Sequence, residues 1–316
     1  MKLAVSSSPH ITGKDTTRSL MMNVVIAMVP AIIASGLVFG LRSVMLIAVT
    51  AAACVGFEYL YQTGMKKPVT VGDMSAVVTG ILLAFNMPST FPFWMAIVGA
   101  FFAIVVVKQL FGGIGFNFAN PAIVARIMLS ISFAGAMTSF VFPKTFSGSD
   151  VLASATPLAA NAAGNAVPYM DMFLGTCGGV LGETSALALL IGFAYLVFTK
   201  TISPAIPLTY VATVAVFAAV LGQDPMTYIL GGGLLLGAIF MATDYVTSPY
   251  TLKGKIIFGL GLGFITVMIR AFGSMTEGVS YAILIMNLLV PYINRLSRQR
   301  PLGVQKSSKK SAGGKN

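Results

Sequence analysis

Ionisable side chains inside apolar segments are the residues of this sequence best suited to chemistry. Glu58, Arg126, Glu183, Asp244 and Arg270 lie within or near runs of apolar residues. Such groups are costly to bury and often serve ion or proton movement. Glu183 and Asp244 stand out, because each lies in a polar break that also contains hydroxyl side chains. We predict that these two carboxylates belong to an ion pathway or line a cavity. The alternative is that each only caps the N-terminus of a short helix.

Motifs of other chemistries are missing from the sequence. It contains no Walker A sequence, no Gly-x-Ser-x-Gly and no His-Glu-x-x-His. Cys54 and Cys177 lie far apart in apolar segments, without the spacing of a metal site, an iron–sulfur site or a disulfide framework. The single histidine, His10, lies in the polar N-terminal arm. We therefore expect no catalytic metal site in this chain.

The elements that position these residues are expected to be membrane-spanning helices. The chain has 316 residues, of which 56% are hydrophobic and 9% are charged, whereas soluble domains carry about 25% charged residues. This composition excludes a soluble enzyme, a nucleic-acid-binding domain and a disordered regulator. A helix needs about 20 apolar residues to cross a bilayer. The sequence predicts an all-α polytopic membrane protein of about ten helices, near residues 20–41, 44–62, 74–87, 91–111, 121–142, 172–198, 203–221, 227–243, 255–272 and 277–293.

Basic residues predict the orientation of these helices, because cytoplasmic loops are enriched in lysine and arginine. With both termini in the cytoplasm, the inner loops collect most of the basic residues, and the outer side keeps only Arg42, Lys144 and Arg270. The net charge of +11 is therefore a topology signal, and no nucleic acid partner is expected. We predict a multi-pass protein of the cell (inner) membrane, with the long polar loop 143–171 outside.

A weak internal repeat divides the chain in two. The sequence GILLAFNMP at 80–88 resembles GLLLGAIFM at 233–241. Five spans per half would give the halves opposite orientations, and such inverted repeats hold ligands at their interface. Chance recurrence of Gly/Leu runs is the alternative. The expected divisions are an N-terminal arm at 1–19, helix repeats at 20–142 and 172–294, the outer loop at 143–171 and a basic tail at 295–316.

Five motifs in order carry a family resemblance. They are TGILL at 79–83, FNFANPA at 116–122, DVLASATPL at 150–158, GETS at 182–185 and FMATDYVTSP at 240–249. Together they resemble the RnfD/NqrB family, and the compact length resembles RnfD more than NqrB. Tyr245 departs from the proline that many relatives have after the aspartate, with no functional consequence that we can argue.

The resemblance implies two flavins. FMN would be joined through its phosphate to the hydroxyl of Thr156, with Ser154 beside it, by a separate flavin transferase that needs this loop to be accessible. Riboflavin would be held without a covalent bond within the membrane domain. Asn117 and Asn120 match family asparagines associated with that site, and amide groups can bind an isoalloxazine edge. The alternative is that both asparagines only cap the helix that follows, with Pro121 at its first position.

The function implied is electron relay by flavin in the Rnf complex, an ion-translocating ferredoxin:NAD oxidoreductase that moves Na⁺ or H⁺. Other membrane and iron–sulfur subunits would be partners. Ferredoxin and NAD would bind those subunits, because this chain has neither a nucleotide motif nor iron–sulfur ligands. Two alternatives remain open: a secondary transporter or channel built from inverted repeats without a redox cofactor, and a structural subunit.

Overall fold

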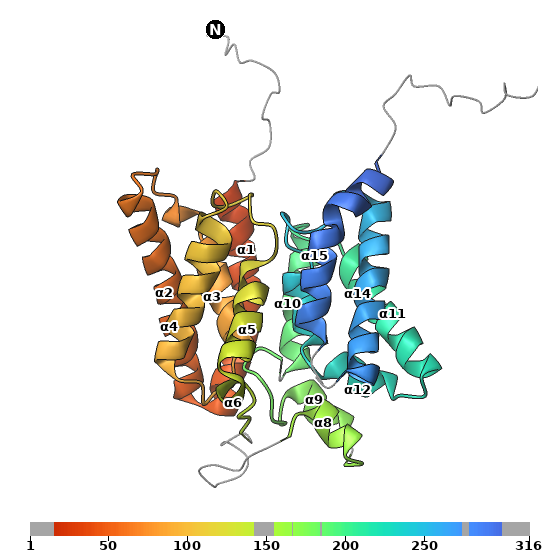
Figure 1. Cartoon of the computed structure of the whole chain (residues 1–316). Coiled ribbons are helices and arrows are strands. Elements are labelled where there is room, and N and C mark those ends of the chain that lie inside the picture. The colour runs from red at the N-terminus through yellow and green to blue at the C-terminus, as the bar shows by residue number, and fades with distance from the viewer. Residues whose placement is uncertain (1–15, 142–154, 166, 184, 274–277, 299–316) are drawn as a thin grey trace, which may run out of the picture.

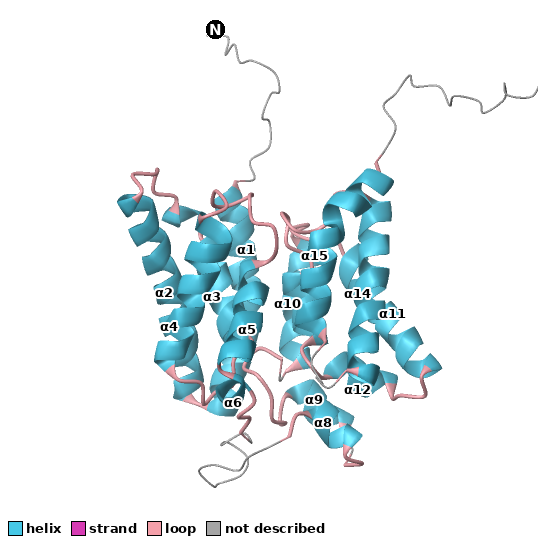
Figure 2. Cartoon of the chain, viewed as in Figure 1, coloured by secondary structure: helices cyan, strands magenta, loops and turns pink. Residues whose placement is uncertain are grey.

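The computed structural model of the chain is an assembly of helices. It describes residues 16–141, 155–165, 167–183, 185–273 and 278–298. Within these ranges the chain forms helices and loops (Figure 2), and an isolated β-bridge joins Pro88 and Val180. The predicted all-α membrane architecture is confirmed.

The first half of the chain contains five spans in sequence order. They are α1 (Thr17–Phe39), α2 (Leu41–Gly64), α3 (Ser75–Phe85), α4 (Phe93–Phe101) continued by the π-helix η2 (Phe102–Gln109), and α5 (Pro121–Ser132). The short helices η1 (Val71–Asp73) and α6 (Ala134–Met137) lie in its loops.

The second half follows the same plan. Its spans are α10 (Ala186–Phe198), α11 (Ala205–Val220), the interrupted series α12 (Pro225–Leu230), α13 (Leu234–Leu236) and η3 (Gly237–Met241), then α14 (Leu252–Phe272) and α15 (Val279–Leu296). Two short helices, α8 (Pro157–Ala162) and α9 (Tyr169–Leu174), lie between the halves in sequence.

In the part of the chain that the structure describes, four helices are long and apolar enough to cross a membrane by themselves: α1, α2, α14 and α15. The fifth and sixth predicted spans contain much shorter helices than the apolar runs suggested, because α5 has 12 residues and α10 has 13. Large apolar side chains remain exposed on the outer helices, as expected where lipid replaces water. Examples are Leu37, Phe198 and Phe272.

Irregular backbone, mainly bends and turns over residues 175–183, precedes the short helix α10. Beyond the end of α3, the backbone N–H of Leu181 donates to the carbonyl of Met87, and that of Gly182 donates to the carbonyl of Phe85. A Cβ atom on Gly182 would lie 2.3 Å from the Cβ of Phe85, so the two segments approach as closely as glycine permits. Irregular backbone inside a membrane protein is stable only where protein or a cavity surrounds it, and here it crosses between the halves.

The two halves run in opposite directions where they meet. The amide of Asn23, in the second turn of α1, donates to Thr201 Oγ1 just beyond the end of α10 at 3.2 Å, and Tyr195 Oη donates to Asn23 Oδ1 at 3.3 Å. The start of the first half therefore lies beside the end of the first span of the second half. This antiparallel contact is what an inverted repeat requires.

The molecule has two distinct ends. Helix α1 begins and α15 ends at one end, which we call the terminal face, while α6, α8, α9 and α12 gather at the opposite end, the loop face (Figure 1). The start of α1 is fixed by a capping box, in which the hydroxyl oxygens of Thr16 and Ser19 each accept from the backbone N–H of the other residue.

A basic residue anchors the interrupted third span in each half. In the first half, Lys108 near the end of η2 donates to Ser75, the first residue of α3, at 2.6 Å. In the second half, Arg270 near the end of α14 donates to the carbonyls of Gly231 and Gly232, just before α13, at 3.1 and 2.9 Å. The two anchors occupy corresponding places at opposite ends of the molecule.

Candidate functional site

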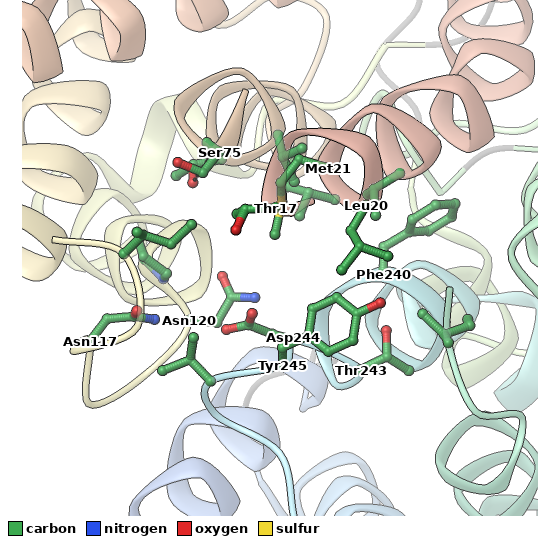
Figure 3. A pocket seen from close by; sticks show the side chains of 18 of the residues that line it. Thr17, Leu20, Met21, Ser75, Asn117, Asn120, Phe240, Thr243, Asp244 and Tyr245 are labelled. Atoms are coloured by element: carbon green, nitrogen blue, oxygen red, sulfur yellow. Dashed lines mark hydrogen bonds between the residues drawn. The ribbon is translucent and has the colours of Figure 1, made fainter. Parts of the chain in front are cut away.

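A cavity of about 430 Å³ opens between the halves near the terminal face. Its walls come from the first turns of α1, from α3, from the loop before α5, from the end of α10 and from η3 with the turn after it. Figure 3 shows Thr17 and Ser75 across the cavity from Thr243 and Tyr245. Ligand sites in proteins have volumes of about 300–1,000 Å³, so this cavity has room for a small organic cofactor.

The cavity wall is mainly apolar with a few polar groups. Apolar side chains on it include Leu20, Leu82, Ile239 and Phe240. Most of the polar groups are those of Ser75, Lys108, Asn117, Asn120, Thr243, Asp244 and Tyr245. An apolar wall with few, convergent polar groups is typical of sites for flat organic ligands. The structure therefore brings together Asn117, Asn120 and Asp244, which the sequence analysis selected separately.

Asn120 has two structural tasks at this site. Its Oδ1 accepts from the backbone N–H of Ala122 at 3.0 Å and caps α5, with Pro121 at the first helical position. Its Nδ2 donates to the carbonyl of Met241, the last residue of η3, at 3.3 Å. The capping role considered from the sequence is confirmed for Asn120, and the amide also ties the two halves together.

Asn117 and Asp244 form the more open part of the polar wall. Asn117 is half-buried and donates to the carbonyl of Ala119 at 3.1 Å. Asp244 is also half-buried; its Oδ2 accepts from Thr247 Oγ1 at 3.0 Å, and its carboxylate is also hydrogen-bonded to the side chain of Asn117. The capping proposed as an alternative for Asn117 is not what the structure shows, because Asn120 holds the N-cap position of α5.

Lys108 is the charged residue of this site that the sequence analysis missed. It was assigned only to the inner-loop charges, but its side chain is 3% exposed and lines the cavity. It pairs with Glu58 of α2, which is 1% exposed, at 2.8 Å between Nζ and Oε1. The π-helix η2 carries Lys108, and π-helices are uncommon and frequently mark functional positions. The sequence did contain a signal for this pair: one apolar run holds a single lysine and another apolar run holds a single glutamate.

Glu183 lies away from the cavity. Its side chain is 8% exposed, and its Oε2 has no hydrogen-bond partner among the described residues. It interacts electrostatically with Arg126 and Arg270. Arg126 Nη1 donates to Ser280 Oγ at 2.6 Å, so this arginine is buried between α5 and α15. The structure therefore separates the two candidate carboxylates: Asp244 lies at the cavity and Glu183 in a cluster with two arginines.

Thr156 is the N-cap residue of α8 at the loop face. Its Oγ1 accepts from the backbone N–H of Ala159 at 3.4 Å, and its side chain is 4% exposed. The sequence analysis expected this threonine on an accessible loop, whereas the structure buries it. The neighbouring Leu158 packs against Gly231 and Gly232, next to the guanidinium of Arg270. Ser154 lies outside the described residues.

Metal ligation is not indicated by the described part of the chain, where no three His, Cys, Asp or Glu side chains gather. Cys54 and Cys177 are both buried free thiols. The polar groups of the cavity are amides, hydroxyls, one carboxylate and one paired ammonium, a donor set that suits an organic ligand better than a metal ion.

Comparisons with known proteins place the chain in a family. The model of the NQR2, RnfD, RnfE family matches residues 4–303. The chain is similar to the D subunit of the Na⁺-translocating ferredoxin:NAD⁺ oxidoreductase complex of Acetobacterium woodii, with 49% identity over 98% of both chains. It is also similar to the D subunit of the proton-translocating ferredoxin:NAD⁺ oxidoreductase complex of Clostridium ljungdahlii (37% identity, 96% of both chains). A third relative is the D subunit of the ion-translocating oxidoreductase complex of Methanosarcina acetivorans (33% identity, 95% of this chain and 96% of the relative). The chain therefore belongs to the NQR2, RnfD, RnfE family.

Proposed function

We propose that this chain is the flavin-carrying membrane subunit of an ion-translocating ferredoxin:NAD oxidoreductase complex, equivalent to the D subunits of its relatives. The named relatives and the family membership support the complex. The observation that carries the flavin part is the cavity at the terminal face, because its size, apolar wall and amide groups suit an isoalloxazine ring. Other membrane and iron–sulfur subunits are the proposed partners, and ferredoxin and NAD bind those subunits.

The charges of the cavity favour riboflavin over a flavin nucleotide. Among the described lining residues, the formal charges are those of Lys108 and Asp244, and Lys108 is already neutralised by Glu58. A phosphate group would meet the Asp244 carboxylate without a free cation to pair with, and unpaired buried charge is costly. Asn117 and Asn120 would hold the polar edge of the ring, and the apolar wall would exclude water from it. When bound, the flavin would supply transfer of one or two electrons.

The experiment for the cavity is flavin analysis of the purified chain. Acid extraction followed by chromatography should release riboflavin, and FMN in excess during purification should not replace it. Asn117→Ala should lower the riboflavin content, because it removes an amide from the wall. Thr138→Ala, which changes an exposed residue at the loop face, should not lower it. Wild-type protein without extractable riboflavin would refute this part of the function.

Thr156 is the proposed attachment site of covalent FMN, with Ser154 beside it. The support is the sequence DVLASATPL and the position of Thr156 at the N-cap of α8, which lies at the loop face (Figure 1). Thr156→Ala should abolish the flavin fluorescence of the denatured protein in a gel, and Thr138→Ala should preserve it. Mass spectrometry that finds only unmodified Thr156 in active complex would exclude the assignment.

Glu183 and Asp244 are proposed to serve the ion-translocation function from different places. A buried carboxylate with an oxygen that accepts no hydrogen bond from the described residues, as in Glu183, can take a proton, whereas Asp244 contributes to the environment of the cavity. Glu183→Gln should leave FMN content unchanged and lower ion transport more than electron transfer. Asp244→Asn should lower electron transfer. Full turnover with a full ion gradient in both variants would exclude these roles.

Ion transport without a redox cofactor is the second candidate function. Its support is the antiparallel contact of α1 with α10 and the meeting of short helices between the halves, which transporters share. Purified protein that lacks both flavins but still moves ions in vesicles would favour this candidate.

A further inference from the structure

The buried pair of Lys108 and Glu58 is more elaborate than stability requires. Besides Lys108, the Glu58 carboxylate accepts from Gln109 Nε2 at 2.7 Å and from Gln62 Nε2 at 3.5 Å. All four side chains are at most 4% exposed. Replacing a buried ion pair by apolar residues is often neutral or stabilising, and ionisable groups inside membrane proteins usually have a function. The network therefore points to a role for the ammonium group that Glu58 holds in place.

A chain of hydrogen bonds leads from this ammonium group toward the terminal face. Lys108 Nζ donates to Ser75 Oγ at 2.6 Å, and Ser75 Oγ donates to Asp73 Oδ1 at 2.6 Å. Lys108 and Ser75 line the cavity. Asp73 lies in η1, is partly exposed, and follows the exposed Gly72. Its second oxygen, Oδ2, is buried and has no hydrogen-bond partner among the described residues. Three groups that can carry a proton thus lead from the cavity wall to a residue that is itself partly exposed.

We propose that Asp73, Ser75 and Lys108 form a proton relay that serves the ligand of this cavity. The inference rests on the proposed riboflavin, which would require protons when electrons from the other redox subunits reduce it. Lys108 Nζ gives a proton to the ligand and takes one from the Ser75 hydroxyl. That hydroxyl turns from Asp73 toward the lysine for this step, because at rest Lys108 donates to Ser75 and Ser75 donates to Asp73. Ser75 Oγ takes one from the Asp73 carboxyl group, and Asp73 takes one from water. The net step moves one proton from water to the cavity, and the three side chains return to their starting states.

The second half of the chain shows why lysine matters at this position. Its corresponding anchor is Arg270, whose guanidinium donates to the carbonyl of Tyr228 in α12 and to two carbonyls of the turn before α13. Arginine remains protonated in proteins, whereas a buried lysine can release its proton. Both residues serve as anchors, but only Lys108 lines the cavity.

The test is the rate of proton uptake when the purified riboflavin-containing complex is reduced, followed with a pH-indicator dye in a stopped-flow instrument. Ser75→Ala and Asp73→Asn break the relay without removing either charge of the Lys108–Glu58 pair. Each should slow proton uptake about 100-fold or more, the usual contribution of a positioned proton donor. Ser75→Thr keeps the hydroxyl and should restore fast uptake.

Thr50→Val is the matched control, because it removes a buried hydroxyl of α2 that bonds only to the Leu46 carbonyl at 2.7 Å; it should leave the rate unchanged. Riboflavin content is measured in every variant. Wild-type uptake rates in Asp73→Asn with full riboflavin content would overturn the relay. If the Ser75→Ala variant loses riboflavin, the relay is judged from the rate of proton uptake in the Asp73→Asn variant alone. Wild-type protein without riboflavin would instead overturn the proposed function.

Discussion

The Lys108–Glu58 pair makes a quantitative prediction about stability. Lys108→Met leaves a carboxylate that is 1% exposed with only amide donors, and Glu58→Gln leaves an ammonium that is 3% exposed with only neutral acceptors. Breaking a buried pair by removing one partner costs about 3–5 kcal/mol. We expect each single substitution to destabilise the chain by about that amount.

The double variant should be much more stable than the sum of the single effects implies. In Lys108→Met with Glu58→Gln no charge remains buried, and a glutamine at position 58 still accepts from Gln109. The remaining loss is the hydrogen bond from Lys108 to Ser75, about 1 kcal/mol. The coupling between the two sites should therefore exceed about 3 kcal/mol, well above the value for independent residues.

The assay is thermal unfolding of the purified chain in one detergent at one pH, for wild type, both single variants and the double variant. The expected order of midpoint temperatures is wild type, then the double variant close below it, then both single variants far below. Additive effects, with the double variant least stable of all, would refute the reasoning that the charges are buried and paired. Gln62→Ala is a useful comparison. The hydrogen bond from Gln62 to Glu58 is long, at 3.5 Å, so its removal should lower the unfolding midpoint less than either single charge substitution.

Three further predictions concern topology and the loop face. A cysteine at Ser147 should react with an impermeant thiol reagent from outside intact cells and a cysteine at Ser308 should not; the reverse pattern would invert the orientation. Burial tends to raise the pKa of Asp224, but hydrogen bonds from Thr227, Tyr169 and Met226 outweigh it and hold the pKa below its usual value. The stability from these contacts is therefore complete above the ordinary aspartate pKa and is lost as pH falls through the lower folded value. Pepsin cleavage near Tyr169 should show this acid step, and Asp224→Asn should lack it. Gly232→Ala should destabilise the loop face by about 1–2 kcal/mol, since Gly232 has φ +64° and its Cβ would lie 2.4 Å from a side chain of α8; unfolding midpoints equal to wild type would contradict this.

The sequence was a good guide to elements with strong local signals. Hydropathy located every long span, and the FNFANPA sequence placed Asn120 and Pro121 correctly at the start of α5. The lengths of α5 and α10 were overestimated, because apolar loops inside a membrane protein have the same composition as helices. Lys108 was overlooked because charge counting cannot distinguish a loop lysine from one whose partner, Glu58, lies 50 residues away in the chain.

The burial of Thr156 has a consequence for biosynthesis. A transferase cannot reach a hydroxyl that is 4% exposed and caps a helix. Attachment of a flavin to Thr156 would therefore require that α8 is not yet packed against Gly231 and Gly232. Modification would then come before the loop face closes, and a chain that folds completely without its transferase would be a poor substrate afterwards. Timing during membrane insertion, more than the local sequence, would decide how much of the protein matures.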